Sequence, residues 1–493
     1  MDEYNHSATE RVININLSSV RLCLQNGDTK KALYYCQLLL AQDPDQVDVL
    51  LFAAIAARAM DDTDVAYCYA DHATKIVPGN PAPHSLLGDI LLIQQKPQAA
   101  LEKLLHSESL GDRSPQNLFN IGSAYLDLEK FKEAKAKLDD ALAINPAMAV
   151  AHVNKGLAEH SLMNLESAID CFDLALRNEP NNIDAKWNKS HVLLTKGDYQ
   201  AGFRLFETRW QNPKVRLKKR KFDSQLWLGQ SDISGKTVLL HAEGGFGDTL
   251  QFIRYVKLFG KDVNLIIQCQ KPLIELVRDS FSNAQIIAPG DEIPKHDFHC
   301  PLMSLPLAFG HDVGTVPTFH RYIYGRKDLV QKWKSFTDKV SKLKIGLMAR
   351  GSGSFNGDKR SIQLEKLERY LPPDADFVYL QKELFDTEKN FIDPRANWMA
   401  PCADFSGTAA ICELLDIVIS VDTSVVHLAA AMGKPTLLLL PFRPDWRWGE
   451  KGEKTIWYPS CTLLRQPQHD DWESVFESIN PAVAKIIAQS SEE

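Results

Sequence analysis

The sequence predicts an array of helical repeats over its first 216 residues, followed by a larger module of two α/β units. Two observations predict this fold class. Small residues recur at one fixed interval in the first part of the chain, and short apolar runs alternate with helical patterns in the second. The first pattern is typical of stacked helical pairs, and the second is typical of parallel sheets covered by helices.

The repeat has a period of 34 residues and is visible in three series of positions. The series are Ala32, Ala66, Ala100, Ala134, Ala168 and Gly202; then Ala54, Gly88, Gly122, Gly156 and Ser190; then Pro44, Pro78, Asp112, Pro146 and Pro180. Small residues let two helices cross closely, and proline suits the turn between pairs. We therefore expect six pairs, at 13–46, 47–80, 81–114, 115–148, 149–182 and 183–216.

These units resemble tetratricopeptide repeats. Each pair buries its remaining apolar face only against the next pair, and the product is a superhelix with a concave surface. The resemblance implies a peptide or protein partner on that surface. A rigid spacer or a dimer surface is the alternative that the sequence leaves open.

Composition and charge exclude several classes of protein. With 493 residues, 44% hydrophobic and 24% charged, the chain is of the globular type. A net charge of -7 argues against a general nucleic-acid binder. The polar start lacks the features of a secretory signal, and no apolar run approaches the ~20 residues of a membrane span. The nine scattered cysteines indicate free thiols, so we expect a cytoplasmic protein without a membrane span.

A basic segment separates the two parts of the chain. Six of the eight residues from Lys214 to Lys221 are basic, and the first strand of the α/β region follows after 235. A solvated linker explains this charge, and so does a contact with an anionic partner or substrate. We place the domains at 1–216, 217–335 and 336–493.

The second part reads as alternating strands and helices. Strands are expected at 237–241, 263–268, 284–287, 344–349, 376–381, 416–420 and 436–440. Helices are expected around 248–259, 271–281, 326–341, 362–371, 408–415, 425–432 and 470–488. Because ligands of parallel sheets bind beyond the carboxyl ends of the strands, the loops at those ends are the candidate sites.

The first candidate loop is a glycine-rich turn. Gly244, Gly245 and Gly247 separate the strand at 237–241 from a helix expected to begin near Asp248 or Thr249. Glycines let a ligand approach the backbone, and a helix start offers unpaired N–H groups. A dinucleotide-binding loop is excluded because the third glycine of G-x-G-x-x-G is missing.

The second candidate loop resembles a phosphate cradle. Asp422, Thr423 and Ser424 can each cap the helix that follows, whose amide groups then point at the turn. His427 lies one turn into that helix and could donate to the same anion, although a core histidine is the alternative.

Two further loops end strands of the same unit. The first carries Arg350, Lys359 and Arg360, and the second carries Gln381 and Lys382. An arginine fork suits phosphate oxygens, and a mobile solvated loop is the alternative. Trp446, Trp448 and Trp457, together with Arg443 and Arg447, are explained equally well by an aromatic wall for a nucleobase and by packing between domains.

Five stretches together resemble bacterial tetratricopeptide-repeat proteins that carry a glycosyltransferase domain similar to the heptosyltransferase family, glycosyltransferase family 9. They are HAEGGFGDTLQFIRY, DFHCPLMSLP, ARGSGSFNGDKRSI, VDTSVVHLAAAMGKP and PDWRWGEKGEKTIWYPSCTLLRQ. The resemblance implies a GT-B fold of two Rossmann-like units, inversion at the sugar, and no metal. It also implies that Asp248 is the general base and that the motif from Asp422 to His427 binds the donor diphosphate.

The sequence departs from that family in three respects. Gly244 replaces a glutamine found in many relatives, and the lysine that heptosyltransferases use near the phosphate has no clear match among Arg350, Lys359 and Arg360. Heptosyltransferases also lack the repeats. The nucleotide and sugar of the donor therefore stay open.

The chemistry of the residues agrees with these roles. A positioned carboxylate can take the proton of an acceptor hydroxyl, with Asp248 as first choice and Glu243 as second. Gly245, Gly247 and Ser304 are assigned to the acceptor side. Thr423, Arg350, Arg360 and Gln381 are assigned to the leaving diphosphate, in place of a metal. Asp374 and Asp376 form a D-x-D, but they lie in a turn before a strand.

We therefore expect a metal-independent, inverting glycosyltransferase without a bound cofactor. Its expected partners are a nucleotide-sugar donor and a protein or glycan acceptor recruited by the repeats. The alternative is a repeat scaffold whose GT-B module binds a nucleotide sugar but is inactive.

Overall fold

The computed structural model describes residues 15–215, 217, 219–312, 314–337, 343–351, 360–381, 402 and 404–490. The chain forms two compact units, Met1–Ala185 and Lys186–Glu493. This division falls within helix α11 (Ile183–Lys196). The last helical pair therefore belongs to the second unit, whereas the sequence placed it with the repeats.

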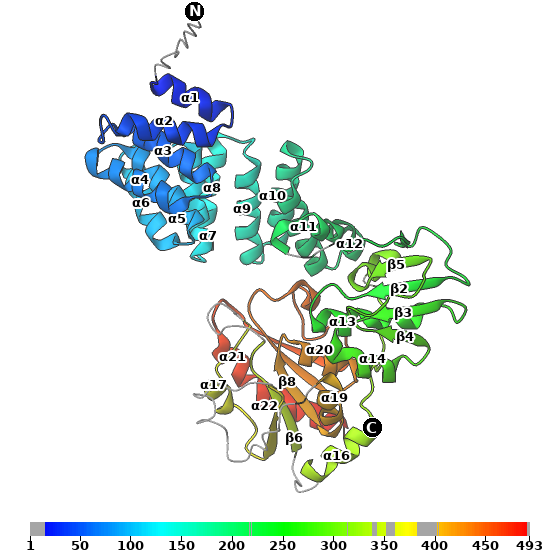
Figure 1. The fold of residues 1–493 in the computed structure, drawn as a ribbon. Coiled ribbons are helices and arrows are strands. Elements are labelled where there is room, and N and C mark those ends of the chain that lie inside the picture. The colour runs from blue at the N-terminus through cyan, green and yellow to red at the C-terminus, as the bar shows by residue number, and fades with distance from the viewer. Residues whose placement is uncertain are drawn as a thin grey trace, which may run out of the picture. The chain divides into compact units, whose positions relative to one another are not determined.

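The first unit is built of paired helices, each pair within one expected repeat (Figure 1). The helices are α1 (Leu17–Gln25), α2 (Thr29–Leu40), α3 (Val47–Ala59), α4 (Thr63–Ile76), α5 (Pro81–Ile93), α6 (Pro97–Ser109), α7 (Pro115–Asp127), α8 (Phe131–Ile144), α9 (Ala149–Ser161) and α10 (Leu165–Asn178). Consecutive helices pack against one another along the unit. The ten helices all lie within the ranges expected for the first five repeats.

The small residues of the repeat are explained by close helix crossings. A Cβ added at Gly122 would lie 2.7 Å from Leu138, and one added at Gly156 would lie 2.6 Å from the ring of Phe172. Interiors packed to this density have no room for an extra methyl group without displacement. The 34-residue interval is therefore a packing constraint.

A fourth series with the same period lies in the turn inside each pair. Its six members all have a positive φ, although only the first and last are glycines: Gly27, Asp61, Gln95, Glu129, Met163 and Gly197. A residue in this left-handed region ends the first helix and reverses the chain. The series is not evident in the sequence because four of its members are residues that rarely adopt such a φ.

The second unit contains two parallel five-stranded sheets. The first has the order β1-β5-β2-β3-β4 and the second the order β10-β9-β8-β6-β7. The strands are β1 (Gln225–Leu226), β2 (Thr237–His241), β3 (Asn264–Gln268), β4 (Ala284–Ile287), β5 (Phe298–Pro301), β6 (Leu343–Met348), β7 (Ala375–Tyr379), β8 (Ile417–Val421), β9 (Thr436–Leu440) and β10 (Cys461–Arg465).

All seven expected strands are present, and the sequence missed β1, β5 and β10. Strand β1 has only two residues and β5 ends in a proline, so neither gives a recognisable apolar run. Strand β10 follows a long aromatic loop rather than a helix, which breaks the expected alternation. The two outer strands β1 and β10 each complete one sheet.

Helices and 3₁₀ turns surround the two sheets. After α11 they are α12 (Tyr199–Phe206), η1 (Glu207–Trp210), η2 (Pro213–Val215), α13 (Phe246–Phe252), η3 (Ile253–Leu258), η4 (Lys271–Leu273), α14 (Ile274–Ser280), η5 (Leu302–Ser304), α15 (Leu305–Ala308), α16 (Lys327–Thr337), α17 (Leu364–Glu368), α19 (Phe405–Leu414), α20 (Ser424–Ala431), η6 (Trp446–Trp448), α21 (Trp472–Glu477) and α22 (Ile479–Ser490). The helices expected from the sequence are confirmed, with shifted ends. No helix in the described part of the chain has the length and apolarity needed to cross a membrane.

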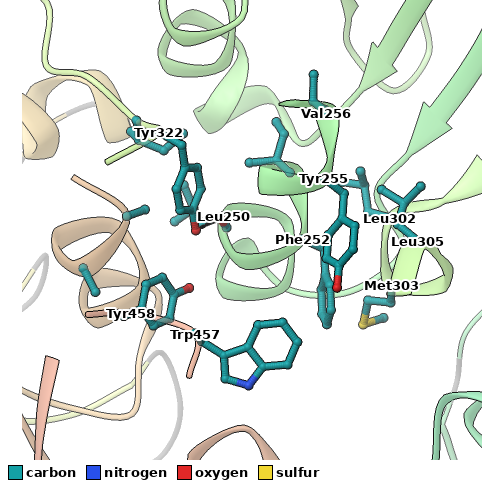
Figure 2. Packing of buried hydrophobic residues seen from close by; sticks show 14 of the residues in the cluster. Leu250, Phe252, Tyr255, Val256, Leu302, Met303, Leu305, Tyr322, Trp457 and Tyr458 are labelled. Atoms are coloured by element: carbon teal, nitrogen blue, oxygen red, sulfur yellow. Dashed lines mark hydrogen bonds between the residues drawn. The ribbon is translucent and has the colours of Figure 1, made fainter. Parts of the chain in front are cut away.

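One aromatic core joins α12 to both α/β halves. Phe203 of α12 lies 5.6 Å from Trp446 and 6.3 Å from Phe252 of α13, ring centre to ring centre. In Figure 2, Trp457 and Tyr458 of the second half lie close to the α13 residues Leu250 and Phe252. This shared core is the physical reason that the last helical pair belongs to the second unit.

A buried arginine adds polar bonds to the same junction. Arg254, fully buried, donates to the Tyr322 hydroxyl at 2.9 Å and to the backbone carbonyl of Trp457. Its guanidinium also lies 4.5 Å from the ring centre of Tyr458. The two halves of the second unit are therefore joined by apolar packing and by hydrogen bonds.

The substitution Gly156→Ala should lower the free energy of unfolding of the first unit. The added methyl group meets the buried ring of Phe172, and overpacking of this kind costs about 1–3 kcal/mol. Gly79→Ala is the control, because a Cβ there has no neighbour within 4 Å. Urea denaturation followed by circular dichroism measures both, and equal stability of the two variants would contradict the packing explanation.

Candidate functional site

A cavity of about 640 Å³ lies at the carboxyl ends of strands from both sheets. Its wall includes Asp248 and the three candidate caps of α20, namely Asp422, Thr423 and Ser424. The lining residues are Gly244, Gly245, Phe246, Gly247, Asp248, Gln270, Pro272, Met348, Gly351, Arg360, Tyr379, Leu380, Gln381, Cys402, Asp404, Phe405, Thr408, Ile411, Asp422, Thr423, Ser424, Val425, His427, Asp445 and Arg447. Gly245 and His427, which are 182 residues apart in the chain, thus line the same cavity.

Asp248 is the third residue of α13, because the helix begins two residues earlier than expected. Its Oδ2 accepts a hydrogen bond of 2.7 Å from the Gly245 N–H. A Cβ at Gly244 would collide with this same oxygen. A side chain at 244 would therefore displace the Asp248 carboxylate from its present position over the turn.

The first turns of α13 and α20 touch at Gly247. A Cβ added to Gly247 would lie 2.7 Å from Cδ2 of His427. Helix α13 comes from the first half of the unit and α20 from the second. The absence of a side chain at 247 therefore lets the two walls of the cavity meet.

The cap of α20 forms as the sequence predicts. The Thr423 hydroxyl accepts a hydrogen bond of 3.3 Å from the Val425 N–H, and Asp422 precedes it at the end of β8. Thr423 and Ser424 both line the cavity. The amide groups of this eight-residue helix therefore begin at the cavity wall.

His427 is held on two sides and stays neutral. Its Nδ1 lies 2.8 Å from the Tyr458 hydroxyl, and its ring stacks on Trp448 with 5.3 Å between ring centres. Burial, together with the nearby charge of Arg447, lowers the pKa of His427 to about 3. The imidazole can therefore offer a hydrogen bond to the cavity but no charge near neutral pH.

Three acidic groups near α20 interact with one arginine, Arg447. Burial and the charge of Asp445 raise the pKa of Asp422 to about 6. Burial also acts to raise the pKa of Asp445, but the charge and hydrogen bonds of Arg447 outweigh it and hold that pKa below its ordinary value. The third group is Asp248, which bonds to Arg447 as well. Arg447 was not assigned to the site from the sequence.

Only some of the loop residues assigned to the diphosphate line the cavity. Arg360 and Gln381 do so. Arg350 is buried and is not part of the lining, although the next residue, Gly351, is. Lys359 and Lys382 lie outside the described residues. Arg360 is therefore the cation from this loop that the structure places at the site.

Glu243 and Ser304 lie together but do not line the cavity. Both bond to Arg209 of η1, at 3.1 Å and 2.6 Å, and Ser304 also donates to Glu207 at 2.7 Å. Burial raises the pKa of Glu243 to about 7, although the charge of Arg209 opposes the shift. Glu243 and Ser304 therefore support the glycine-rich turn from outside the cavity, through Arg209, which no sequence motif indicated.

The three tryptophans of the aromatic loop are core residues. Trp446, Trp448 and Trp457 are all buried, and none of them lines the cavity. Packing is therefore the explanation the structure confirms. Two other aromatic residues line the cavity. They are Phe246 and Phe405, which come from opposite halves and have 5.1 Å between their ring centres.

The basic linker is anchored at its end to the first sheet. Arg220 donates to Gln268 at the end of β3, and the ring of Phe222 lies 5.0 Å from that of His241. Neither nitrogen of His241 has a hydrogen-bond partner, and burial followed by the charge of Arg220 lowers its pKa to about 3. This part of the segment is therefore a contact and not only a solvated linker.

Among the described residues, no group of three or more His, Cys, Asp or Glu side chains is placed to hold a metal ion. His296 and His299 are three residues apart in the chain and have other partners: His299 bonds through Nδ1 to Ser224 at 3.0 Å, and His296 bonds to a backbone carbonyl at 2.8 Å.

Comparisons with known proteins support the two parts of the chain unequally. The model of a family described as tetratricopeptide repeat matches residues 119–183. Protein FlbA of Caulobacter vibrioides is 22% identical over 405 residues, which cover 75% of this chain and 66% of FlbA. The putative lipopolysaccharide heptosyltransferase 4 of Escherichia coli is 45% identical over 60 residues, which cover 12% of this chain and 16% of that protein.

The chain thus spans less than two thirds of the length of either relative. Among solved structures, the APC/C hetero-tetramer Cut9–Hcn1 is similar with a TM-score of 0.37 and 19% identity, over 40% of this chain and 39% of that chain. The N-terminal region contains tetratricopeptide repeats, as the sequence predicted.

Gly247→Ala should destabilise the second unit by about 1–3 kcal/mol, because the new methyl group meets the ring of His427, which Tyr458 and Trp448 hold in place. Gly245→Ala is the matched control, since its nearest contact would be an ordinary 3.6 Å. Thermal unfolding of both variants checks this, and the prediction fails if Gly247→Ala is as stable as wild type.

A second prediction concerns His241 and pH. Its folded-state pKa of about 3 lies below the ordinary value of about 6.5, so the unfolded chain takes up a proton first as the pH falls. The stability that depends on neutral His241 is complete above pH ~6.5 and is lost progressively below it. Between pH 7.5 and 5 the loss should be roughly 2 kcal/mol.

His241→Phe should remove this part of the pH dependence, which urea denaturation at both pH values measures. The exposed His320 provides the control His320→Gln, which should follow wild type. A variant at 241 that still loses as much stability as wild type at pH 5 rules out this role.

Proposed function

We propose that this protein is a metal-independent, inverting glycosyltransferase of the GT-B type. It moves a sugar from a nucleotide-sugar donor to an acceptor, a protein or a glycan, which the helical repeats recruit. The observation that carries the proposal is that Asp248 lines the same cavity as the capped start of α20. A carboxylate and an anion-binding helix end are the two groups that sugar transfer without a metal requires.

The donor diphosphate would lie at Thr423 and Ser424. The first turn of α20 would offer it backbone N–H groups besides that of Val425, which Thr423 already holds, but a helix end contributes only about 0.3–1 kcal/mol. A charge-assisted bond from Arg360 would add roughly 1.5–3 kcal/mol, and the neutral imidazole of His427 can add one more bond. These groups would stabilise the nucleoside diphosphate as it leaves.

Asp248 would act as the general base. Its side chain is 26% exposed at the cavity, so an acceptor hydroxyl can reach it. As the hydroxyl oxygen bonds to the anomeric carbon, its proton passes to Asp248 and the bond from that carbon to the phosphate oxygen breaks. Attack from the face opposite the diphosphate inverts the configuration.

Other findings support parts of this proposal. The short match to a heptosyltransferase agrees with the transferase module, and tetratricopeptide repeats agree with recruitment of an acceptor or other protein partner. All nine cysteines are free in the structure, which suits a reducing cytoplasm, where we place the protein. No cofactor beyond the donor is part of the proposal.

A scaffold that binds a nucleotide sugar without turnover is the second candidate. The charge of the described lining counts against donor binding in both candidates. This lining holds four carboxylates and two arginines, namely Asp248, Asp404, Asp422 and Asp445 against Arg360 and Arg447. Such a balance opposes a diphosphate, unless Asp422 takes up a proton, which its raised pKa favours.

A thermal-shift screen with UDP, ADP, GDP and their sugar conjugates tests the donor site. A ligand at 100 times its Kd should raise the free energy of unfolding by about 2.7 kcal/mol. If none of these compounds stabilises the protein, both candidates lose their common premise. Release of the nucleoside diphosphate from a sugar conjugate then separates the enzyme from the scaffold.

Asp248→Asn should lower transfer by about 10²–10⁴-fold, because the amide cannot accept the proton. Binding of the nucleoside diphosphate found in the screen should stay within a factor of two by calorimetry. Asp262→Asn, at an exposed position before β3, is the control. Unchanged turnover in Asp248→Asn would remove this residue from the mechanism.

A further inference from the structure

Arg447 joins the two halves of the candidate site. It belongs to η6, in the loop after β9, and it lines the cavity. Within its own half it donates to Asp445 at 2.8 Å. Across the cavity it donates to Gln251 at 2.6 Å and to Oδ1 of Asp248, both on α13.

The shape of the guanidinium matches this set of acceptors. Asp248 and Gln251 are three residues apart on α13 and therefore lie on the same face of the helix. The Nε–H points to Gln251, one terminal nitrogen to Asp248 and the other to Asp445. Arginine has a rigid planar fork of donors, and the single ammonium of lysine cannot reproduce three such directions.

Packing fixes the arginine as firmly as its hydrogen bonds do. The guanidinium lies 4.5 Å from the ring centre of Trp446, and only 10% of the side chain is exposed. Trp446 in turn lies 5.6 Å from Phe203 and 6.2 Å from Phe206, both on α12. The last helical pair therefore supports Arg447 from behind.

The carboxylate of Asp248 depends on this support for its orientation. Its Oδ2 is held by the neighbouring Gly245 N–H, and its Oδ1 is held by Arg447 from the other half. With the first bond alone, the carboxyl group could still turn about the atoms that carry it. The second bond fixes the plane of the carboxylate, and a displacement of 1 Å at such a group can cost 10²-fold in rate.

We propose that Arg447 is a positioning residue that holds Asp248 in the orientation for removing the acceptor proton, and that α12 holds Arg447 through Trp446. The catalytic part of this proposal rests on the proposed function. Arg447 does not itself touch the reacting atoms in this arrangement. A direct contact between Arg447 and the donor diphosphate is the competing role, and it predicts a different result.

The test is Arg447→Lys in the full-length protein, with Arg465→Lys as the matched control. Arg465 lies in the same half and donates to the backbone carbonyls of Trp448, Gly449 and Gly452. Arg447→Lys should lower kcat roughly 100-fold while the Kd of the nucleoside diphosphate, UDP or ADP by calorimetry, stays the same. Arg465→Lys should lower the melting temperature and leave kcat unchanged.

The opposite pattern would overturn the proposal. A weakened Kd with an unchanged kcat would assign Arg447 to the donor. If Arg447→Lys does not fold, Gln251→Leu removes one of the three acceptors and should lower kcat in the same way but less. An unchanged kcat in that variant also counts against positioning.

A crystal structure of Arg447→Lys separates this proposal from the proposed function. Positioning predicts that the carboxylate of Asp248 turns away from its wild-type direction, whether or not the protein transfers a sugar. A wild-type protein without transferase activity would defeat the proposed function, and a turned Asp248 would still support the contact network. An Asp248 that keeps its direction in the variant would overturn the positioning role.

Discussion

The close contact between Gly247 and the ring of His427 is the constraint on which the cavity depends. It places the start of α13 against the start of α20, although these helices belong to different sheets. A side chain at 247 would separate them and move Asp248 away from Thr423. The ring cannot yield easily, because Tyr458 and Trp448 hold it. The absence of a side chain at 247 therefore lets the two helix starts meet at the cavity.

The charged groups beside this contact, Asp422, Asp445 and Arg447, are costly to desolvate, so their presence calls for a functional explanation. Buried carboxylates are expensive to desolvate, and a buried ion pair often does no more than break even against apolar packing. The pKa values of Asp422 and Asp445 shift in opposite directions, because burial raises that of Asp422 while the charge and hydrogen bonds of Arg447 lower that of Asp445. Shifted groups of this kind gather at functional sites more often than elsewhere. Their place at a cavity wall is thus evidence for a binding or catalytic role.

The sequence predicted what depends on local pattern and missed what depends on distant partners. The 34-residue period, the seven strands and the cap at Thr423 follow from short-range rules of packing and turns. Arg447 could not be assigned, because its partner Asp248 lies 199 residues away and no local pattern joins them. Arg209, which holds Glu243 and Ser304, was missed for the same reason. The residues with positive φ also recur every 34 positions, but four of the six are not glycine, so their residue types do not indicate such a turn.

The position of α12 changes the meaning of the domain boundary. A linker at 217–235 would let the repeats move freely with respect to the α/β halves, but α12 already shares their core through Phe203 and Phe206. The segment that follows is itself tied to the first sheet at Arg220 and Phe222. Because Trp446 lies between α12 and Arg447, a change in the packing of α12 reaches Asp248 through three successive contacts, α12 to Trp446, Trp446 to Arg447 and Arg447 to Asp248. The last repeat therefore supports the site structurally, and the boundary between the two compact units falls within α11.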